Sequence, residues 1–256
     1  MSVSLLGTDE PGAFQEFQTA GRSDFLIVVD HAGARIPRML ADLGLPQAEL
    51  RRHIAWDIGA LAVARGVAQI LDAPLLSQTY SRLVIDCNRD PKVPSSIPRI
   101  SELCEIPGNC ALSAAQINAR RAEIFDPYHG RIRELIDARI AEGRRVILVA
   151  QHTMTDVYKG LRRNMHAAVL YNRDRRFAGP VLEMLRRDPD LLVADNEPYF
   201  VSDETDYTIP HHGEARALPH VEIEIRQDLV SDENGQAEWA ARIAGALCDA
   251  QKQFDR

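Results

Sequence analysis

Three short segments, far apart in the chain, each place a histidine or a glutamate at the end of an apolar run: FLIVVDHAG, VILVAQHT and HVEIEIR. The residues concerned are His31, His152 and Glu224. Imidazole and carboxylate groups bind divalent metals and transfer protons, so the three residues are suited to metal-assisted hydrolysis. Each run has the pattern of a buried strand, and open α/β sheets bind ligands beyond the carboxyl ends of their strands. We therefore expect the three side chains to meet at one edge of a sheet.

A catalytic zinc ion usually takes three protein ligands from histidine and acidic residues and leaves one position for water. His31 and His152 supply two of these ligands. Asp57 begins a helix predicted over residues 57–71, where the helix dipole favours a carboxylate. Taken alone, each residue has a structural explanation, Asp57 as a helix-start carboxylate and His31 as a hydrogen-bonded loop histidine. Their expected co-location favours a zinc site formed by His31, Asp57 and His152.

The segment HVEIEIR offers an acid or base for the reaction. Alternation along a strand sends Val221, Ile223 and Ile225 to one face, and Glu222 and Glu224 to the other. A carboxylate shielded from water beside a metal can accept a proton from water and return it to a leaving amine. The spacing does not choose between Glu222 and Glu224, and a solvated acidic face is the alternative explanation.

The segment YSRLVIDCNRD contains Arg82, Asp86, Asn88 and Arg89. An arginine fork binds a carboxylate through two hydrogen bonds, and a neighbouring asparagine adds a donor. Asn88 and Arg89 therefore predict a site for an acidic substrate, with surface ion pairing as the alternative for Arg89.

Strands and helices are expected to alternate along the chain, which predicts a mostly parallel sheet covered on both faces. The predicted strands are 25–30, 74–79, 82–86, 146–151, 166–171, 191–195 and 219–225. The predicted helices are 57–71, 113–142, 174–187 and 236–254. Ser113 and Gln116 form a capping box, Pro127 should kink or split the long helix, and Gly143 should end it.

Two long connections, 87–112 and 196–218, interrupt this alternation, and we expect them to form walls or lids of the site. The 256 residues are expected to form a single α/β domain, with a core over about 25–254 and an N-terminal extension over 1–24.

Composition excludes several classes of protein. The net charge of −7, with arginines interleaved among acidic residues, argues against a nucleic-acid partner. No apolar stretch reaches the roughly 18 residues of a membrane span, and the first residues lack the pattern of a secretory signal. We therefore expect a cytoplasmic protein that does not bind a membrane. The four cysteines show no CxxC spacing and are expected to be free thiols. The sequence carries no indication of the oligomeric state.

These segments also carry a family resemblance. DHAGARIP, WDIGALAVA, YSRLVIDCNRD, VAQHT, HHGEA and VEIEIR occur in the order seen in the N-formylglutamate amidohydrolase family, over roughly residues 25 to 230. The resemblance implies a three-layer αβα sandwich with a mostly parallel central sheet, similar in fold to zinc-dependent exopeptidases and to the zinc amidases of cell-wall turnover. It also implies one zinc ion per chain, with another divalent metal as the alternative.

Carried over residue by residue, the resemblance implies His31, Asp57 and His152 as zinc ligands, Glu224 as general base, and Asn88 and Arg89 as the site for the substrate carboxylate. Zinc carboxypeptidases place a glutamate three residues after the first histidine, whereas this chain has Ala34 there. The acidic ligand must then come from elsewhere, and Asp57 matches by position.

In the mechanism this implies, zinc acidifies a water molecule, Glu224 takes its proton and later protonates the leaving nitrogen, and His212 or Arg82 stabilises the oxyanion. The expected substrate is an acidic N-acyl amino acid, with N-formyl-L-glutamate giving formate and L-glutamate. One alternative is a metallo-carboxypeptidase or an amidase of other specificity. Another is a ligand-binding protein of the same fold without turnover.

Overall fold

This computed structural model describes residues 4–256. Its central sheet divides the apolar core into two parts, as strand β2 (Phe25–Val29) shows. Its five residues are all buried. The odd-numbered side chains from Phe25 to Val29 belong to one apolar cluster, and the even-numbered Leu26 and Val28 belong to a second. Because side chains alternate across a strand, the two clusters lie on opposite faces of one sheet.

Within residues 4–256 the main sheet has seven strands in the order β1-β3-β2-β6-β11-β9-β10. In chain order they are β1 (Phe14–Phe17), β2, β3 (Leu75–Gln78), β6 (Ile147–Met154), β9 (Ala167–Leu170), β10 (Val193–Asp195) and β11 (His220–Arg226). The four central strands β3, β2, β6 and β11 are parallel to one another, so their carboxyl ends meet at one edge. Strand β9 runs antiparallel to β11, and β1 runs antiparallel to β3.

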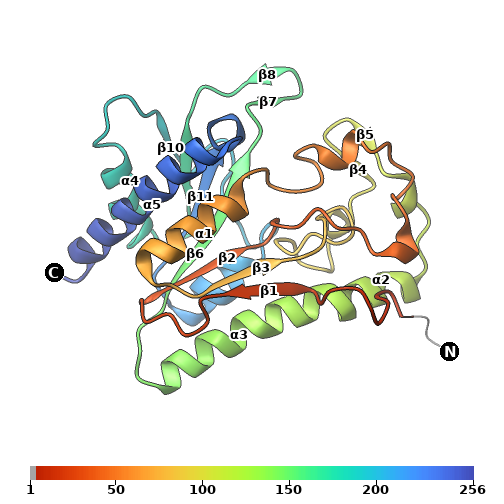
Figure 1. Ribbon diagram of the computed structural model, residues 1–256, viewed down its shortest axis with the longest axis horizontal. Helices are drawn as coiled ribbons and strands as arrows, with labels where there is room; N and C mark the ends of the chain where they lie inside the picture. Colours follow the sequence, from red (N-terminus) through yellow and green to blue (C-terminus); the bar gives the residue numbers. More distant parts are fainter. Residues whose placement is uncertain (1–3) are drawn as a thin grey trace.

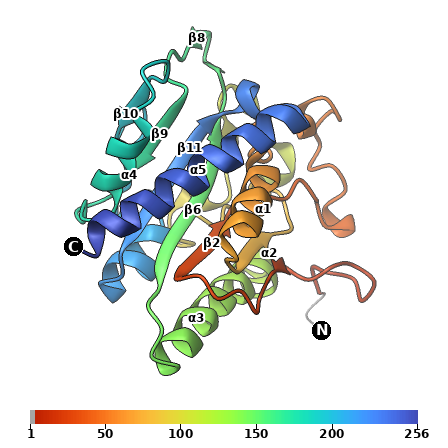
Figure 2. The same ribbon diagram turned by 60° about the vertical axis from the view of Figure 1, so that its left-hand side comes forward.

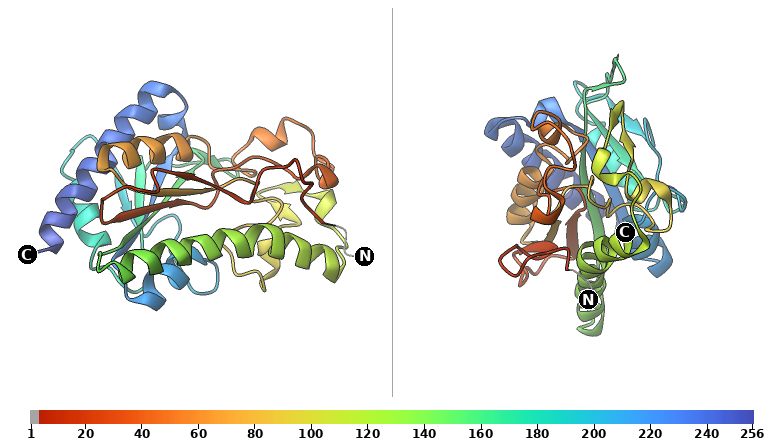
Figure 3. Two further views of the ribbon diagram at one scale, coloured as in Figure 1. Left: turned by 60° about the horizontal axis from the view of Figure 1, so that its bottom comes forward. Right: turned by 90° about the vertical axis from the view of Figure 1, so that its right-hand side faces the viewer.

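Helices cover both faces of this sheet (Figures 1 and 3). Helices α1 (Ala60–Leu71), α4 (Ala178–Leu185) and α5 (Glu233–Phe254) pack on the face of the odd-numbered β2 residues. Figure 2 shows α1 and α5 lying side by side over strands β2, β6 and β11. Helix α3 (Asp126–Ala141) packs on the opposite face, preceded by the short helix α2 (Ala114–Arg120). No helix in the described part of the chain has the length and apolar character that crossing a membrane requires.

The architecture confirms the predicted α/β fold with a mostly parallel central sheet between helical layers. The predicted long helix is split by a turn of π-helix at Arg121–Phe125, just before Pro127. The capping box of Ser113 and Gln116 is present, and Gly143 follows the end of α3 with a positive φ of 71°. Proline has no N–H to bond the turn before it, which accounts for the widened π-helical turn, and the helical backbone continues through it.

One predicted strand is wrong. Residues 82–86 form a buried turn, because their backbone groups bond to loops and not to a neighbouring strand. The Arg82 N–H donates to the carbonyl of Ala55, and the Asp86 N–H donates to the carbonyl of Ser96. The apolar side chains of Leu83, Val84 and Ile85 are buried all the same.

Three strand pairings were not predicted. Strand β1 lies in the segment that we expected to be an N-terminal extension, and it joins the edge of the sheet beside β3. Two small hairpins, β4–β5 (Ile100–Ser101, Cys104–Glu105) and β7–β8 (Val157–Tyr158, Leu161–Arg162), extend from the main sheet. Their strands have two residues each, too few for a periodic pattern in the sequence.

Candidate active site

His31 lies just past the carboxyl end of β2, in a loop that is held against the end of β3. A side chain at Gly33 would place its Cβ 2.0 Å from the carbonyl oxygen of Thr79, so only glycine permits this approach. The Ser81 N–H donates to the carbonyl of Arg35 at 2.7 Å and closes the loop from the other side. The position of His31 is thus fixed by the backbone that follows it.

Asp57 lies three residues before α1, and not within its first turn as predicted. Gly59 caps the helix with a φ of 82°, and a Cβ there would lie 2.5 Å from the carbonyl oxygen of Val230. The Asp57 N–H donates to the carbonyl of His31 at 2.9 Å. The two predicted ligands are therefore joined through their backbones.

His152 and Glu224 lie inside strands and not beyond their ends. His152 is the sixth residue of the eight-residue β6, which extends three residues past its predicted end. In the parallel register, Glu224 of β11 is the partner of His152, and Glu222 is the partner of Ala150. The predicted alternation of HVEIEIR is confirmed, because Val221, Ile223 and Ile225 belong to the apolar cluster on the opposite face.

The three predicted metal ligands meet in one buried group. The Oδ2 atom of Asp57 lies 3.0 Å from Nδ1 of His152 and 3.5 Å from Nδ1 of His31. One ligand atom from each of the three residues lies within 4.8 Å of the others. Nδ1 of His31 is buried and has no hydrogen-bond partner among the described residues. Two nitrogens and a carboxylate oxygen in this arrangement fit a zinc ion.

Each histidine also faces a second carboxylate. Nε2 of His31 is hydrogen-bonded to Asp86 at 2.7 Å, whereas Nε2 of His152 lies 3.3 Å from Oδ2 of Asp30 without a hydrogen bond. Histidines that bind metals commonly present their other nitrogen to a carboxylate in this way. Neither aspartate was assigned a role from the sequence, although Asp30 precedes His31 at the end of the same apolar strand.

The charges of this region favour a cation. Burial alone would lower the pKa of both His31 and His152, but the surrounding carboxylates raise both pKa values. Burial alone would raise the pKa of Asp57, but the two histidines hold it below its usual value. The converging carboxylates therefore favour positive charge at the centre of the site, which either the protonated histidines or a bound divalent cation would supply.

The pKa values of Glu222 and Glu224 are raised, in contrast to the lowered pKa of Asp57. Burial raises the pKa of Glu224 to about 7 and that of Glu222 to about 8. The Oε2 atoms of both residues have no hydrogen-bond partner among the described residues. A carboxyl group whose pKa is near neutrality can both accept and return a proton, as general acid–base catalysis requires.

Arg82 lies beside the predicted ligands. Its Nε and Nη2 donate to Asp86 at 3.1 and 2.7 Å, and its Nη1 lies 3.5 Å from Oδ1 of Asp57. Both aspartates raise the pKa of Arg82 despite its burial, so the guanidinium stays charged. Arg82 can therefore orient the Asp57 carboxylate and present positive charge to the cavity.

Asn88 and Arg89 also reach the cavity, but their polar groups are used differently. The side-chain carbonyl of Asn88 accepts from the backbone N–H groups of Tyr207 and Thr208, at 3.1 and 3.0 Å. Arg89 donates through Nη1 to the carbonyl of Thr205 and makes no ion pair in the described part of the chain. Arg89 thus offers free donors to an anion, whereas most of the Asn88 amide is occupied within the protein.

His212 does not lie in the cavity where we expected it to stabilise the oxyanion. Its Nε2 lies 3.0 Å from Nδ1 of His129, whose own Nε2 bonds the carbonyl of Cys87. The ring is buried in this pair and does not line the cavity that contains the predicted ligands. The HHGEA segment spans the end of a π-helical turn, Ile209–Gly213, and the start of a 3-10 turn, Glu214–Arg216. Ile209 of the π-helical turn packs in the apolar cluster on the α3 face of the sheet, and we assign His212 no contact with substrate.

The cavity above these residues has a volume of about 480 Å³. Both predicted loops line it, 87–112 through Pro98, Ile100 and Glu102, and 196–218 through Tyr199 and Phe200. Its floor is charged, and its outer wall includes an apolar part in which Ile100 is 61% exposed and Phe200 is 67% exposed. The β7–β8 hairpin adds Tyr158, which the sequence did not indicate.

Comparison with known proteins decides the family. A family model described as N-formylglutamate amidohydrolase matches residues 23–231, a range that contains all the residues of this site. The chain belongs to the N-formylglutamate amidohydrolase family. The prediction of this family and of an amidohydrolase is therefore confirmed. No sequence among the curated proteins matches the chain.

Solved structures share the fold of this member of the N-formylglutamate amidohydrolase family. The gene product Atu2144 from Agrobacterium tumefaciens is 37% identical, with a TM-score of 0.95 over 98% of this chain and 100% of that chain. N-formylglutamate amidohydrolase from Ralstonia eutropha JMP134 is 21% identical, with a TM-score of 0.70 over 94% of this chain and 98% of that chain. At this lower identity the second comparison shows a shared fold.

Proposed function

We propose that this protein is a zinc-dependent hydrolase of N-acyl amino acids, and that N-formyl-L-glutamate is its substrate. The observation that carries the proposal is the buried group of His31, Asp57 and His152 beside Glu224. Zinc bound by the three ligands would supply a Lewis acid that polarises the amide carbonyl and lowers the pKa of water. The products would be formate and L-glutamate.

Glu224 acts as general base and then as general acid in this proposal. Its carboxylate takes a proton from the attacking water and delivers it to the nitrogen that leaves as an amine. The burial of Glu224 supports this role, because it brings the pKa of the group near neutrality. The charged Arg82 faces the same space and stabilises the negative charge that develops on the carbonyl oxygen.

Arg89 binds the substrate carboxylate. A guanidinium pairs with a carboxylate through two parallel N–H donors, and Arg89 lines the cavity without an acidic partner of its own among residues 4–256. Asn88, which we expected to share this role, supports the loop that carries Thr205 and Asp206 through its bonds to Tyr207 and Thr208.

An amidase of other specificity is the second candidate function, and the apolar outer wall favours it. Ile100, Tyr199 and Phe200 surround space that a formyl group would leave empty. A larger apolar acyl group would remove these side chains from water, which is favourable at about 25 cal/mol per Å². A cytoplasmic location is also part of our proposal, in agreement with four cysteines that form no disulfide.

A panel of substrates separates these possibilities. Purified, zinc-loaded protein is assayed with N-formyl-, N-acetyl- and N-benzoyl-L-glutamate, and release of free L-glutamate is measured. Highest kcat/KM with the formyl compound supports N-formylglutamate hydrolysis, and highest kcat/KM with the benzoyl compound supports the second candidate. Absence of turnover with the whole panel, at full zinc occupancy, would favour a binding protein.

A further inference from the structure

The contacts of Nε2 in His31 and His152 bear on which nitrogen of each ring can bind a metal. Nδ1 of each ring points toward Asp57, and Nε2 of each ring points toward a second aspartate. A neutral imidazole carries one proton, and a carboxylate beside Nε2 holds that proton on Nε2. Nδ1 of His31 has no hydrogen-bond partner among the described residues, whereas Nδ1 of His152 bonds Oδ2 of Asp57 at 3.0 Å and would exchange that contact for the metal.

Asp86 and Asp30 must therefore be held in place, and they belong to different parts of the fold. Asp86 accepts from Arg82 and from the backbone N–H of Asn88, the latter at 2.9 Å. Asp30 accepts from the hydroxyl groups of Tyr128 and Thr208, each at 2.8 Å. Asp30 has no arginine or lysine partner in the described chain, so its orientation depends on these two hydroxyls.

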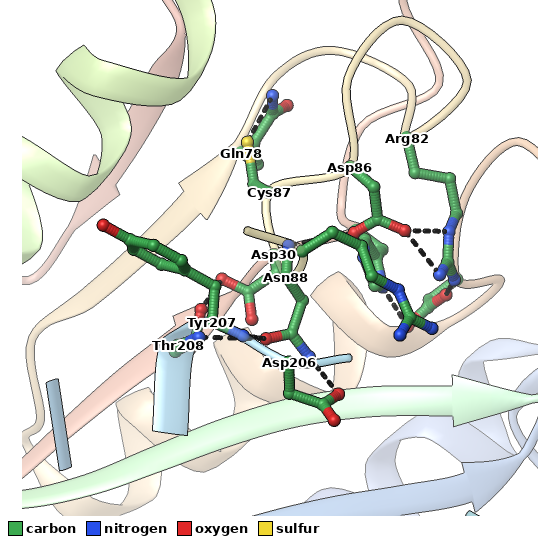
Figure 4. A network of polar contacts seen from close by, with 12 residues as sticks. Asp30, Gln78, Arg82, Asp86, Cys87, Asn88, Asp206, Tyr207 and Thr208 are labelled. Atoms are coloured by element: carbon green, nitrogen blue, oxygen red, sulfur yellow. Dashed lines mark hydrogen bonds and ion pairs between the residues drawn. The ribbon is translucent and has the colours of Figure 1, made fainter. Parts of the chain in front are cut away.

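Asn88 connects the two aspartates (Figure 4). Its backbone N–H donates to Asp86, and its side-chain carbonyl accepts from the backbone N–H of Thr208, whose hydroxyl donates to Asp30. Hydrogen bonds thus lead from His31 through Asp86, Asn88 and Thr208 to Asp30. The path reaches His152 through a 3.3 Å contact between Oδ2 of Asp30 and Nε2 of His152 that is not a hydrogen bond in this structure. The exposed fraction along this path is at most 5%, which excludes bulk water as a competing partner.

We propose that Asn88 and Thr208 are positioning residues that hold both histidine ligands in the form that binds metal. This inference rests on the proposed metal site. It gives Asn88 a role other than substrate binding, and it explains why a loop segment more than 100 residues away from Asn88 is fastened beneath the cavity. Neither residue contacts the metal ligands directly; each acts through an aspartate.

The test is zinc affinity, measured on the full chain by competition with a chelator of known affinity. Thr208→Val keeps the shape of the side chain but removes the donor to Asp30, and we expect zinc binding to weaken by about 10–100-fold. Thr208→Ser keeps the hydroxyl and should retain affinity close to that of the wild type. Thr79→Val is the matched control, because the Thr79 hydroxyl is buried without a hydrogen-bond partner.

A double-mutant cycle tests the connection itself. If Asn88 and Thr208 act through one path, Asn88→Ala combined with Thr208→Val should weaken zinc binding by less than the product of the two single effects. Spectra of ¹⁵N-histidine in the zinc-loaded wild type should show both ligand rings protonated on Nε2. Thermal unfolding of each metal-free variant shows whether it is folded.

The experiment distinguishes failure of the positioning role from failure of the proposed metal site. A folded Thr208→Val variant with the zinc affinity of the wild type would overturn the positioning role and leave the proposed function intact. A wild-type protein that binds no zinc would instead overturn the proposed metal site on which the inference rests.

Discussion

Glu224 of β11 is the register partner of His152 of β6, so the two side chains stand next to each other on one face of the sheet. Glu222 pairs with Ala150, roughly 6–7 Å further back along the strand. Both glutamates are buried, and only position along the strand separates them. The register therefore supports Glu224 as the residue that exchanges protons with the substrate.

The first prediction follows from this register. Glu224→Gln is nearly isosteric and should retain zinc, but it should lower kcat by about a hundredfold or more, because the base acts in the chemical step. Glu222→Gln should have a milder effect. Single-turnover rates and zinc content of both variants check the prediction, and a larger loss of rate in Glu222→Gln would contradict it.

The metal ligands give a second prediction. His31→Ala and His152→Ala should each lose zinc, because each removes one of three protein ligands, while the fold remains largely intact. His211→Ala is a suitable control, since His211 is exposed and does not line the cavity. Metal analysis together with circular dichroism provides the measurement. Full zinc retention in both variants would show that His31 and His152 are not the zinc ligands.

Arg89 gives a third prediction. Arg89→Lys should raise KM for acidic N-acyl substrates by tenfold or more with little change in kcat, because lysine offers a point charge in place of a fork. Arg65→Lys, a change at an exposed position on α1, should leave the kinetics unchanged. Unaltered KM in Arg89→Lys would place the substrate carboxylate elsewhere.

The apolar wall of the cavity gives a fourth prediction. Phe200→Ala should reduce kcat/KM for N-benzoyl-L-glutamate several-fold more than for N-formyl-L-glutamate, because only the larger acyl group reaches the wall. Leu103→Ala changes a side chain that is 78% exposed outside this cavity and serves as the control. Equal effects of Phe200→Ala on both substrates would show that the acyl group does not contact this wall.

Much of the sheet and of the metal-ligand group could be predicted from the sequence. His31 follows a five-residue apolar strand, and His152 and Glu224 lie in strands of eight and seven residues. Apolar or alternating runs of this kind give a clear signal in the sequence. Their parallel arrangement brings their carboxyl ends together, so separate motifs could be assigned to one site. The alternation of HVEIEIR placed both glutamates on the correct face for the same reason.

The remaining features depend on tertiary contacts that leave no periodic signal. The run from Leu83 to Ile85 is as apolar as a strand, but its backbone is bonded to loops on either side. His212 belongs to a histidine-rich loop, yet its partner is His129 on α3, which no local pattern connects to it. Asp30 and Asp86 stood within the motifs, but their role appears only when the histidine rings are placed.

The most direct test of the central claim is the zinc dependence of N-formyl-L-glutamate hydrolysis. The wild-type protein is stripped of metal with a chelator, titrated with zinc, and assayed for release of formate. We predict that activity is absent after stripping, returns in proportion to bound zinc and saturates at one zinc ion per chain. Full activity of the stripped protein, or no activity at one bound zinc per chain, would contradict this account.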